Sequence, residues 1–577
     1  MINYIKKHKL LLGSLYNRFL VLIFFFFLSS ILELISISSL IPIINFFFNE
    51  KELFKLVNSI PIEVIKNYLT NLPSKNILIY VSFLAGIIYT LKGVFNTFIV
   101  FKIFRFTQKI KLYISEKIYK NYLYKDVLFF SQNKTEKILR TLSSDITNFS
   151  SHFCTCLSMF IAEVFIIFSL VLFLIYFAPI VSLALILFAI IIYFANTLYI
   201  RKKLINISYE RQIEESNQLK LINYLSKLIT EIKIYSKQDK FFNNFFLSLN
   251  QLEKLVFKFN IISNMPKYIF ETILFLIIII FLMVNVLFFQ IGNNFAATLS
   301  LIVIIILRIL PSLIRCTNLF TVINYYSSSF NHLYEELKHY SYSDNKIKKI
   351  SLNKIELKNI CYRYPYKSQN IFAGLNLVIK KGDRVGIKGN SGAGKSTLTK
   401  IIAGLIKPNS GKIILNNLRT INNNSLKIGY VSQNIFLLDD SLVNNIIFEG
   451  IKEKKKVNKY KLKKILDICC LNDLVKELPK KTNAQIGESG IKLSGGQKQR
   501  ISIARALYAN PDLIILDEAT NALDKSTENK ILRNIFRYYK DKTIIIVSHN
   551  YNILKLCNNI INLNKKKVSY KLIDKLL

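Results

Sequence analysis

Long apolar segments fill the N-terminal part of this chain, and they limit its fold more than any other feature. Six of them are long enough to cross a bilayer as helices, near Phe19–Phe48, Ile77–Phe101, Leu157–Phe177, Ile180–Ile200, Tyr268–Phe289 and Ala296–Leu313. Hydrophobic residues make up 51% of the 577-residue chain, as is typical of a membrane protein. The sequence therefore predicts an all-α transmembrane domain with six spans over residues 1–339.

Basic residues predict the orientation of these spans. The segment before the first span is basic, as are the long connectors Lys102–His152 and Arg201–Lys267, whereas the short turns carry no Lys or Arg. By the positive-inside rule, both termini and both connectors are expected in the cytoplasm. The first span is longer than a signal-peptide core, so we expect it to be retained.

The long connectors are predicted to be helical. Lys109–Tyr124 and Gln212–Lys227 carry apolar residues at helical spacing between charged ones, which indicates that the spans continue into the cytoplasm. Each connector is expected to bend back through a short transverse helix, near Asp126–Asn133 and near Glu231–Tyr235. On the outer side, Asn49–Lys75 predicts an amphipathic helix on the membrane surface.

The residue pattern of the sequence changes after a polar, Lys-rich linker over residues 340–349. Beyond it, short apolar strands are separated by Gly and Asn, with helical stretches between them. Arg384–Lys388, Leu513–Leu516 and Thr543–Val547 are expected to be buried parallel strands. Residues 350–577 therefore predict an α/β nucleotide-binding domain.

A glycine-rich run follows the strand Arg384–Lys388 and opens a predicted helix. Its candidate ATP-binding residues are Gly389, Asn390, Ser391, Gly392, Ala393, Gly394, Lys395, Ser396 and the adjoining Thr397. Glycines let the backbone approach a phosphate closely, and N–H groups at a helix N-terminus bind its charge. Lys395 adds a positive charge, and the Ser396 hydroxyl is a candidate Mg²⁺ ligand. The run predicts a P-loop that binds ATP with Mg²⁺.

Four further residues are expected near the phosphates. Asp517 ends an apolar strand and is a candidate Mg²⁺ ligand, and Glu518 beside it is the natural general base for the attacking water. His549 and Gln433 each follow a predicted strand, where His549 can reach the γ-phosphate and Gln433 can sense Mg²⁺. The predicted catalytic residues are Glu518, His549 and Gln433, and the predicted metal ligands are Ser396, Gln433 and Asp517.

A second anion site is predicted at the start of a helix over about Gln499–Leu507. Its candidate ligands are Ser494, Gly495, Gly496 and Gln497. One domain does not need two such sites for one nucleotide. The simplest use is across a dimer, in which this segment closes on the ATP held by a second copy of the chain.

These motifs resemble the ABC transporter ATPase domain, and the resemblance covers essentially all of Ile350–Leu577. It implies adenine stacking for Tyr364 in Tyr362–Pro365, the Q-loop for Gln433, the catalytic glutamate for Glu518, the D-loop for Asn521–Asp524 and the switch histidine for His549. Asn521 replaces the commoner Ser, and Asn550 stands where an Arg often follows the His. Neither change removes a catalytic group, so both sites of a homodimer are expected to hydrolyse ATP.

The N-terminal half resembles an ABC exporter half-transporter, with six spans, long cytoplasmic connectors and a fused ATPase domain. The resemblance implies that the two transverse helices are coupling helices. It also implies a homodimer in the lipid bilayer of a bacterial inner (plasma) membrane, with the ATPase domain in the cytoplasm. The expected function is ATP-driven export or flipping of a substrate.

Charged residues inside the spans are expensive and usually functional. Arg308 and Arg315 share one face of the sixth span, and Lys92 lies in the second. They are candidates for binding an anionic substrate such as a pyrophosphate headgroup. The alternative is internal pairing with the acidic residues at membrane depth, Glu33, Glu163 and Glu271.

The segment Leu32–Pro42, with Arg308 and Arg315 around Leu310 and Pro311, looks like bacterial flippases of lipid-linked oligosaccharides. That resemblance implies an anionic, lipid-linked substrate. Multidrug, lipid and peptide exporters share the scaffold and stay open as alternatives. A non-transporting ABC ATPase and a gated channel are alternatives of other classes, and the six apolar segments argue against the first of these.

The formal net charge of +42 also fits binding to nucleic acid. Lys is nevertheless spread along the whole chain together with Asn, Ile and Phe, which indicates compositional bias, so no nucleic-acid partner is expected. Attraction of cytoplasmic Lys to anionic lipid headgroups is an expected side effect. The seven cysteines lack zinc-site spacing and are expected to be free thiols.

Overall fold

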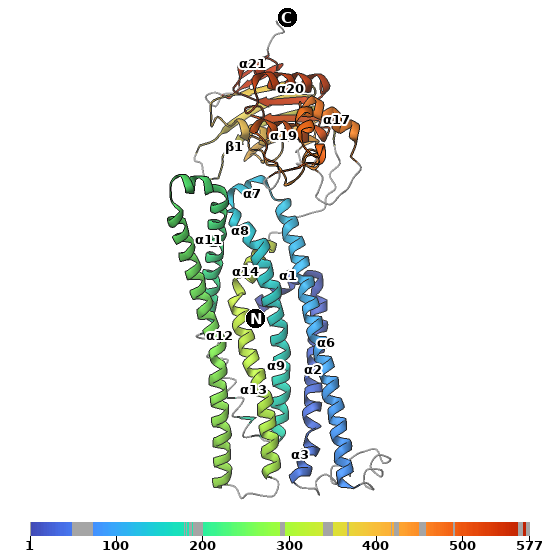
Figure 1. Ribbon diagram of the computed structural model, residues 1–577, viewed down its shortest axis with the longest axis vertical. Coiled ribbons are helices and arrows are strands. Elements are labelled where there is room, and N and C mark those ends of the chain that lie inside the picture. Colours follow the sequence, from blue (N-terminus) through green and yellow to red (C-terminus); the bar gives the residue numbers. More distant parts are fainter. Residues whose placement is uncertain are drawn as a thin grey trace. The chain divides into compact units, whose positions relative to one another are not determined.

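The computed structural model divides the chain into two compact units (Figure 1). Unit 1 consists of Met1–Lys125 and Phe130–Tyr342, and unit 2 of Asp126–Phe129 and Ser343–Leu577. The structure describes residues 2–48, 73–177, 200–288, 295–338, 350–365, 369–416, 418–419, 426–448, 457–487, 491–563 and 569–572, and also residues 179, 182, 183 and 187. The predicted linker, residues 340–349, lies outside them and stays a prediction.

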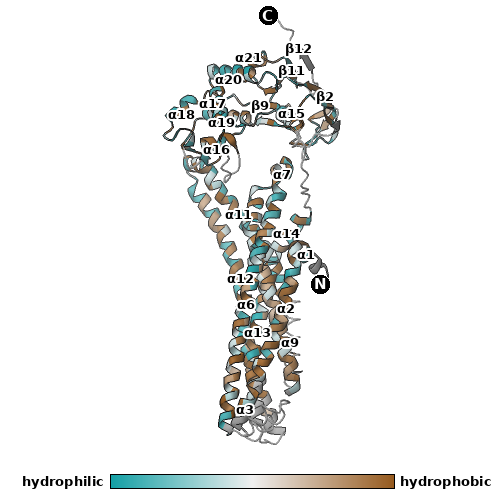
Figure 2. Cartoon of the chain, turned by 90° about the vertical axis from the view of Figure 1, so that its right-hand side faces the viewer, coloured by the Kyte–Doolittle hydropathy of each residue, from teal (hydrophilic) through white to brown (hydrophobic). Residues whose placement is uncertain are grey.

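Unit 1 is built from helices, as predicted. They are α1 (Ile2–Leu12), α2 (Tyr16–Ser38), α3 (Ile41–Phe48), α6 (Ser74–Leu123), α8 (Thr135–Arg140), α9 (Thr155–Phe177), α11 (Arg201–Ile234), α12 (Gln238–Phe288), α13 (Phe295–Tyr325) and α14 (Ser327–Lys338), with π-helical stretches at Thr141–Asp145 and Asn148–Cys154. α9 packs against both α2 and α13, α2 packs against α6, and α11 packs against α12. Figure 2 shows hydrophobic residues along much of the long helices, as burial in lipid requires.

Several helical stretches among the described residues are long and apolar enough to cross a membrane. They are Lys7–Ile44, Lys75–Leu123, Thr135–Tyr176 and Val303–Tyr325, which overlap the first, second, third and sixth predicted spans. The fourth predicted span, Ile180–Ile200, lies almost entirely outside the described residues, and the fifth falls in the C-terminal part of α12. The predicted outer helix, Asn49–Lys75, also lies mostly outside them.

The first predicted span is broken by a turn, whereas the sequence predicted one continuous segment. α2 and α3 lie on either side of a two-residue turn. The hydroxyls of Ser36 and Ser39 donate to the carbonyl oxygens of Glu33 and Ser36 at 2.8 and 2.7 Å. Pro42 follows and has no N–H to donate to the helical ladder. Competing hydroxyls and a missing donor weaken the helix at this point, which explains the break.

The long connectors are helical, because α6 and α11 continue past the apolar segments. The short helix α7 (Val127–Gln132) occupies the first predicted transverse position. The second position has no separate helix of its own, because α11 continues to Ile234. The backbone of α11 leaves helical geometry at Leu228, where φ is −115° and ψ is 17°. The second predicted transverse position, near Glu231–Tyr235, therefore falls in the last part of α11, beyond this kink.

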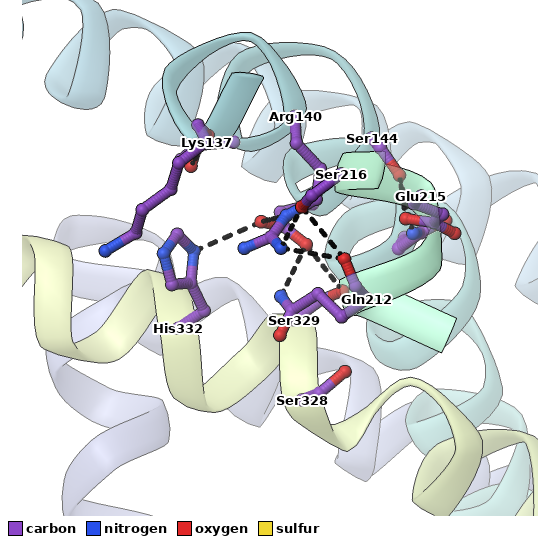
Figure 3. Close-up of polar contacts among 12 residues, drawn as sticks. Lys137, Arg140, Ser144, Gln212, Glu215, Ser216, Ser328, Ser329 and His332 are labelled. Atoms are coloured by element: carbon purple, nitrogen blue, oxygen red, sulfur yellow. Dashed lines mark hydrogen bonds and ion pairs between the residues drawn. The ribbon is translucent and has the colours of Figure 1, made fainter. Parts of the chain in front are cut away.

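A buried carboxylate joins three helical segments of unit 1. Asp145 is fully buried, and its Oδ1 accepts hydrogen bonds from Gln212 Nε2 at 2.9 Å and from Ser329 Oγ at 3.0 Å. Arg140 Nε lies 3.2 Å and His332 Nδ1 lies 3.1 Å from its other oxygen. Figure 3 shows these four partners converging from α8, α11 and α14. The cluster fixes the helix of the third span against the helices that follow the fourth and sixth spans.

Unit 2 is an α/β domain, as predicted, built around a six-stranded sheet of order β12-β11-β3-β10-β9-β6. Its strands are β3 (Arg384–Lys388), β6 (Ile428–Val431), β9 (Leu513–Asp517), β10 (Thr543–Val547), β11 (Asn559–Asn562) and β12 (Ser569–Leu572). Every neighbouring pair is parallel except β11 with β12. Because β3, β6, β9 and β10 are parallel, the residues that follow them meet at one edge of the sheet.

A second sheet of unit 2 is antiparallel and has the strand order β2-β1-β4-β5. Its buried residues belong to the second hydrophobic core of this unit. Its members are β1 (Lys354–Tyr362), β2 (Phe372–Lys380), β4 (Ser410–Leu415) and β5 (Leu418–Arg419), and β7 (Asp440–Ser441) pairs with β8 (Gln485–Ile486). The helices of unit 2 are α15 (Lys395–Ile402), α16 (Leu442–Ile447), α17 (Lys459–Ile468), α18 (Asn472–Glu477), α19 (Gly495–Tyr508), α20 (Lys525–Tyr538) and α21 (Tyr551–Leu554).

Candidate active site

The glycine-rich run forms a turn between β3 and α15. Gly392 and Gly394 have φ angles of +80° and +95°, a region that favours glycine. A Cβ on Gly394 would lie 2.5 Å from Ile371 Cγ2, whereas a Cβ on Gly392 would meet open space. Lys395 is the first residue of α15, so the turn ends at a helix N-terminus. The turn therefore brings its backbone to a place where an anion binds favourably.

The ammonium group of Lys395 lies at the centre of the site and is nearly buried. It donates to the carbonyl oxygens of Gly389 and Asn390 at 2.9 and 3.3 Å, and its Nζ lies 2.9 Å from His549 Nε2. Because an ammonium group only donates, His549 Nε2 is the acceptor in this contact. Glu518 Oε1 lies 4.0 Å from the same ammonium group. A single cation thus contacts both the glycine-rich turn and the predicted catalytic residues.

Asp517 and Ser396, both predicted metal ligands, lie together. Asp517 is 2% exposed, and its Oδ1 accepts a hydrogen bond from Ser396 Oγ at 3.2 Å. Its Oδ2 accepts from Tyr430 OH at 3.0 Å and from Thr399 Oγ1 at 3.3 Å. Burial, and then the charge of Asp517, raise the pKa of Tyr430, so the phenol stays protonated and donates. Both carboxylate oxygens are therefore held in fixed positions.

Tyr430 and Thr399 were not predicted to belong to the site, although the sequence holds a signal for each. Thr399 lies three residues after Ser396 on α15, and residues at this spacing share a helix face. Tyr430 lies on β6, which pairs with β9 in a register that places Tyr430 opposite Ile515. The position of Tyr430 follows from strand order, which the sequence alone did not reveal.

Glu518 connects three loops of the site. Its Oε2 accepts hydrogen bonds from Gln433 Nε2 at 3.0 Å and from Asn521 Nδ2 at 3.2 Å, and its Oε1 lies 3.5 Å from His549 Nε2. Its φ is +52°, and its N–H donates to the carbonyl oxygen of Val547 on β10 at 3.2 Å. Residues with side chains rarely adopt this region, and those that do cluster at functional sites. The structure thus brings the predicted residues Glu518, His549 and Gln433 together.

Tyr364 lies beside the N-terminal part of α15. Its OH is 3.2 Å from Thr397 Oγ1, and its ring meets that of Tyr362 edge-on, with centroids 5.1 Å apart at 81°. The ring is partly buried, which leaves one part of the aromatic surface accessible. These contacts fix the ring next to the glycine-rich turn, and its proposed stacking on adenine stays a prediction.

The second predicted anion site lies at the start of α19. Ser494 is the N-cap, its Oγ accepts from Gln497 N–H at 3.2 Å, and Gln497 Oε1 accepts from Ser494 N–H at 2.8 Å. Ser494 and Gly495 are exposed, so this helix start is open to solvent. Gln499, which the sequence did not single out, accepts from Ala522 N–H at 2.9 Å and so ties α19 to the predicted D-loop. Among the described residues, none of these hydrogen bonds involves a residue of the glycine-rich turn.

The predicted substrate residues of unit 1 lie in ion pairs. Lys92 Nζ is 2.9 Å from Glu33 Oε1, and Arg308 Nε bonds the same oxygen. Arg315 Nε and Nη2 bond the two carboxylate oxygens of Glu163 at 2.6 and 3.2 Å. The internal pairing that the sequence left open is thus present for these three cations. Three cations against two carboxylates leave one unit of positive charge in the group.

A cavity of about 440 Å³ lies between the helices that carry these charges. Its polar lining consists of Ser29, Asn96, Glu163, Arg308, Arg315 and Asn318, and its other lining residues are mostly apolar. Lys92 is not among them, because its ammonium group points to the fully buried Glu33. Asn318 Oδ1 is buried without a hydrogen-bond partner among the described residues. Glu271, the third acid considered above, makes no ion pair within that part of the chain.

Two family models match the chain. The model of the ABC transporter transmembrane region matches residues 17–310, and the ABC transporter model matches residues 372–521. The chain belongs to the ABC transporter family. In this ABC transporter, the order of a helical membrane domain followed by an α/β domain agrees with the order of the two models.

Curated relatives of this ABC transporter match it over different lengths. The α-hemolysin translocation ATP-binding protein HlyB of Escherichia coli O157:H7 is 39% identical over 219 residues, 37% of this chain. The chain spans only 30% of the length of that protein. The ATP-dependent lipid A-core flippase of Wigglesworthia glossinidia brevipalpis is 27% identical over 483 residues, 80% of each chain.

A solved structure shares the fold. It is a bacterial Atm1-family ABC exporter with ATP bound, with a TM-score of 0.77 and 18% identity over 96% of this chain and 95% of that one. At this identity the likeness concerns the fold alone. It agrees with the predicted exporter-type arrangement of helices followed by an ATPase-type domain.

Proposed function

We propose that this chain is an ATP-driven exporter or flippase that works as a homodimer in a bacterial inner membrane. The observation that carries the proposal is the convergence of Gln433, His549 and Lys395 on the carboxylate of Glu518. A carboxylate that accepts a hydrogen bond from Gln433 and lies near Lys395, beside a glycine-rich turn, is suited to orient a water molecule for attack on a phosphate. The apolar helices of unit 1 support coupling of that reaction to a membrane.

Each site residue has a distinct part in the proposed reaction. The backbone at Gly392, Gly394 and Lys395 would bind the phosphates of ATP, and the Lys395 ammonium would balance their charge. Glu518 would orient the attacking water, and Gln433 holds the second oxygen of that carboxylate in place. Hydrolysis would then separate two copies of the chain that ATP had brought together.

Mg²⁺ fits the residues at the end of β9. It would be held by Ser396 and Asp517, with Gln433 nearby, and these supply the hydroxyl, carboxylate and amide oxygens that this ion prefers. The pairing of Ser396 Oγ with Asp517 Oδ1 at 3.2 Å already places two such oxygens side by side. When bound, the ion would neutralise charge on the phosphate oxygens.

Tyr430→Phe tests whether the position of Asp517 matters for this ion. The substitution removes the 3.0 Å hydrogen bond to Asp517 Oδ2 and leaves the ring in place. We expect ATPase activity to need roughly tenfold more Mg²⁺ for half of its maximum, as is usual when a partner of a metal ligand is lost. The measurement is a Mg²⁺ titration of ATPase rate, with the exposed Tyr460→Phe as the matched control. An unchanged titration curve would show that Tyr430 does not position Asp517.

The exposed start of α19 supports the dimer. Ser494 and Gly495 form a helix N-terminus that is open to solvent in this chain and would suit an anion. In the proposed dimer it would bind the phosphates of ATP held by the other copy. A chain that stays monomeric by light scattering with saturating ATP and no hydrolysis would contradict this arrangement.

For the substrate, we propose an anionic lipid-linked oligosaccharide or a related glycolipid. The cavity of unit 1 presents Arg308 and Arg315 beside an apolar lining, which suits a pyrophosphate group on a lipid. The positive charge in excess of the two carboxylates favours an anionic ligand. The name of the lipid A-core flippase, which matches 80% of both chains, supports a lipid substrate.

Arg308→Ala with Arg315→Ala tests the substrate. We expect flipping of a pyrophosphate-linked lipid in proteoliposomes to fall roughly tenfold or more, because each charge-assisted hydrogen bond contributes about 1.5–3 kcal/mol. Basal ATPase activity should remain, since neither residue lies in unit 2. Arg201→Ala with Lys202→Ala removes two exposed cations elsewhere and should leave flipping intact. Full flipping by the Arg308/Arg315 variant would rule out the basic lining.

A protein or peptide substrate is the second candidate. It is favoured by the 39% identity to the α-hemolysin translocation protein, but that match covers only 37% of this chain. Peptide-stimulated ATPase activity, with no response to glycolipid, would favour this alternative over the lipid.

A further inference from the structure

A second cavity in unit 1, of about 320 Å³, lies between α2 and α6. Its polar lining consists entirely of cations, Arg18, Lys102, Arg105 and Lys109. The rest of the lining is apolar and consists of Val21, Leu22 and Phe25 on α2 and Phe106 on α6. Neither the ATPase-type site nor the cavity at Arg308 uses any of these residues.

The four cations have no acidic partner among the residues that the structure describes. None of them makes an ion pair within the described part of the chain, and the contact found for Lys102 is with the ring of Phe98 at 4.9 Å. The sequence explains this, because residues 1–32 and 64–115 contain no Asp or Glu. Like charges at i, i+3 and i+4 repel each other on a helix face, so Lys102, Arg105 and Lys109 lower the stability of α6 unless an anion lies between them.

The cations lie at the predicted cytoplasmic surface of the membrane. Arg18 directly precedes the first predicted span, and Lys102 directly follows the second. From Lys102 to Lys109 the helix rises by about 10 Å, somewhat more than the depth of about 5–8 Å of one headgroup layer. The apolar lining residues Val21, Leu22 and Phe25 lie on the span side of Arg18. The cavity thus combines cations at the predicted headgroup level with apolar residues, most of which lie on the span side of Arg18.

We propose that this cavity, which we call the α2–α6 site, binds the phosphate headgroup of an anionic phospholipid of the cytoplasmic leaflet. The cations bind the phosphate, and the apolar lining contacts the start of an acyl chain. The positive-inside rule requires an excess of Lys and Arg beside a span, but it does not require these charges to lie close together. Here the charges converge on one cavity from two neighbouring helices, as in basic lipid pockets between spans. A free phosphate ion gains no stabilising contact from the apolar lining, whereas the acyl chain of a lipid does. We therefore favour a lipid as the occupant.

The test measures lipid retention by the purified full-length chain. The wild type and the variant Arg18→Gln with Arg105→Gln are mixed with detergent micelles that contain dioleoyl-phosphatidylglycerol, and retained lipid is counted by native mass spectrometry. We expect the variant to need roughly tenfold or more phosphatidylglycerol for equal retention, as two cations near a lipid phosphate should contribute. Phosphatidylcholine micelles should show no difference between the two proteins.

Lys202→Gln with Lys203→Gln is the matched control. These residues are exposed at the predicted cytoplasmic end of the fourth span, outside the α2–α6 site. If the control loses as much lipid as the Arg18/Arg105 variant, the attraction is only general surface charge and the proposal fails. Equal retention by the Arg18/Arg105 variant and the wild type also overturns it. Inorganic phosphate at millimolar concentration should not displace the lipid, and if it does, the site binds phosphate and not a lipid.

This result is independent of the substrate. Arg18 and Arg105 belong neither to the catalytic site nor to the cavity at Arg308, so ATPase activity in phosphatidylcholine should equal that of the wild type. Retention lost together with that basal activity would point to misfolding. The thermal unfolding midpoint of each variant is therefore measured first. Lipid retention is compared only between proteins whose midpoint matches that of the wild type.

Discussion

Glu518→Gln should lower the ATPase rate about 10²–10⁴-fold, the range expected when a general base is lost. Gln has nearly the shape of Glu, and its amide oxygen can still accept from Gln433 or Asn521, which bond the native side chain at 3.0 and 3.2 Å. The neutral amide cannot take a proton from water. ATP binding should therefore survive, because the glycine-rich turn and Lys395 are untouched.

The measurement is phosphate release at saturating ATP, together with binding of a fluorescent ATP analogue. Glu477→Gln supplies the matched control, since it makes the same chemical change on an exposed side chain of α18. A wild-type rate in Glu518→Gln would remove Glu518 from the proposed role. Loss of nucleotide binding would instead show that the residue mainly holds the site in shape.

Asp145→Ala should lower the free energy of unfolding of unit 1 by roughly 3–5 kcal/mol, as is typical when one member of a buried ion pair is removed. The side chain is fully buried and Arg140 is 9% exposed, so the substitution leaves a buried guanidinium group without its carboxylate. Gln212 Nε2 and Ser329 Oγ also lose their acceptor. Figure 3 shows that these donors have converged on one point, so a single truncation affects several segments.

The sequence has no Trp, so unfolding is best followed with a thiol-reactive dye that labels buried cysteines such as Cys154. Asp145→Asn keeps an acceptor for Gln212 and Ser329 but removes the charge that Arg140 needs, and its midpoint should lie between those of Ala and wild type. Glu210→Ala, an exposed carboxylate on α11, should change little. An unfolding midpoint for Asp145→Ala equal to that of wild type would show that the cluster does not stabilise the unit.

The helical membrane unit and the α/β domain could be predicted because local sequence determines them. Continuous apolar runs predicted β9 and β10, which are buried at every residue. The glycine-rich run predicted the turn between β3 and α15, and the structure adds that Gly392 and Gly394 have positive φ angles there. Parallel strands then require that Asp517 and His549 meet at one edge, which explains why the ATPase-type site could be assembled from sequence.

Contacts between distant segments could not be predicted in the same way. The order of the strands brings Tyr430 within hydrogen-bond distance of Asp517. Helix packing brings Arg140, Gln212 and Ser329 around Asp145. No local sequence pattern encodes either arrangement. The sequence left the pairing of the membrane charges open because several acids lie at similar depth. The break between α2 and α3 depends on side-chain hydroxyls that bond back to the helix, and a count of hydrophobic residues does not detect it.

Glu33 binds two cations, Lys92 and Arg308, through one oxygen, so the loss of either contact would leave it one ion-pair partner. When Arg308 turns away, Glu33 still bonds Lys92 at 2.9 Å, so no bare carboxylate remains in the low-dielectric interior. Glu163 has no second cation of this kind, because Arg315 is its ion-pair partner within the described residues. Loss of the Arg308 contact would therefore leave Glu33 paired with Lys92, which still joins α2 and α6.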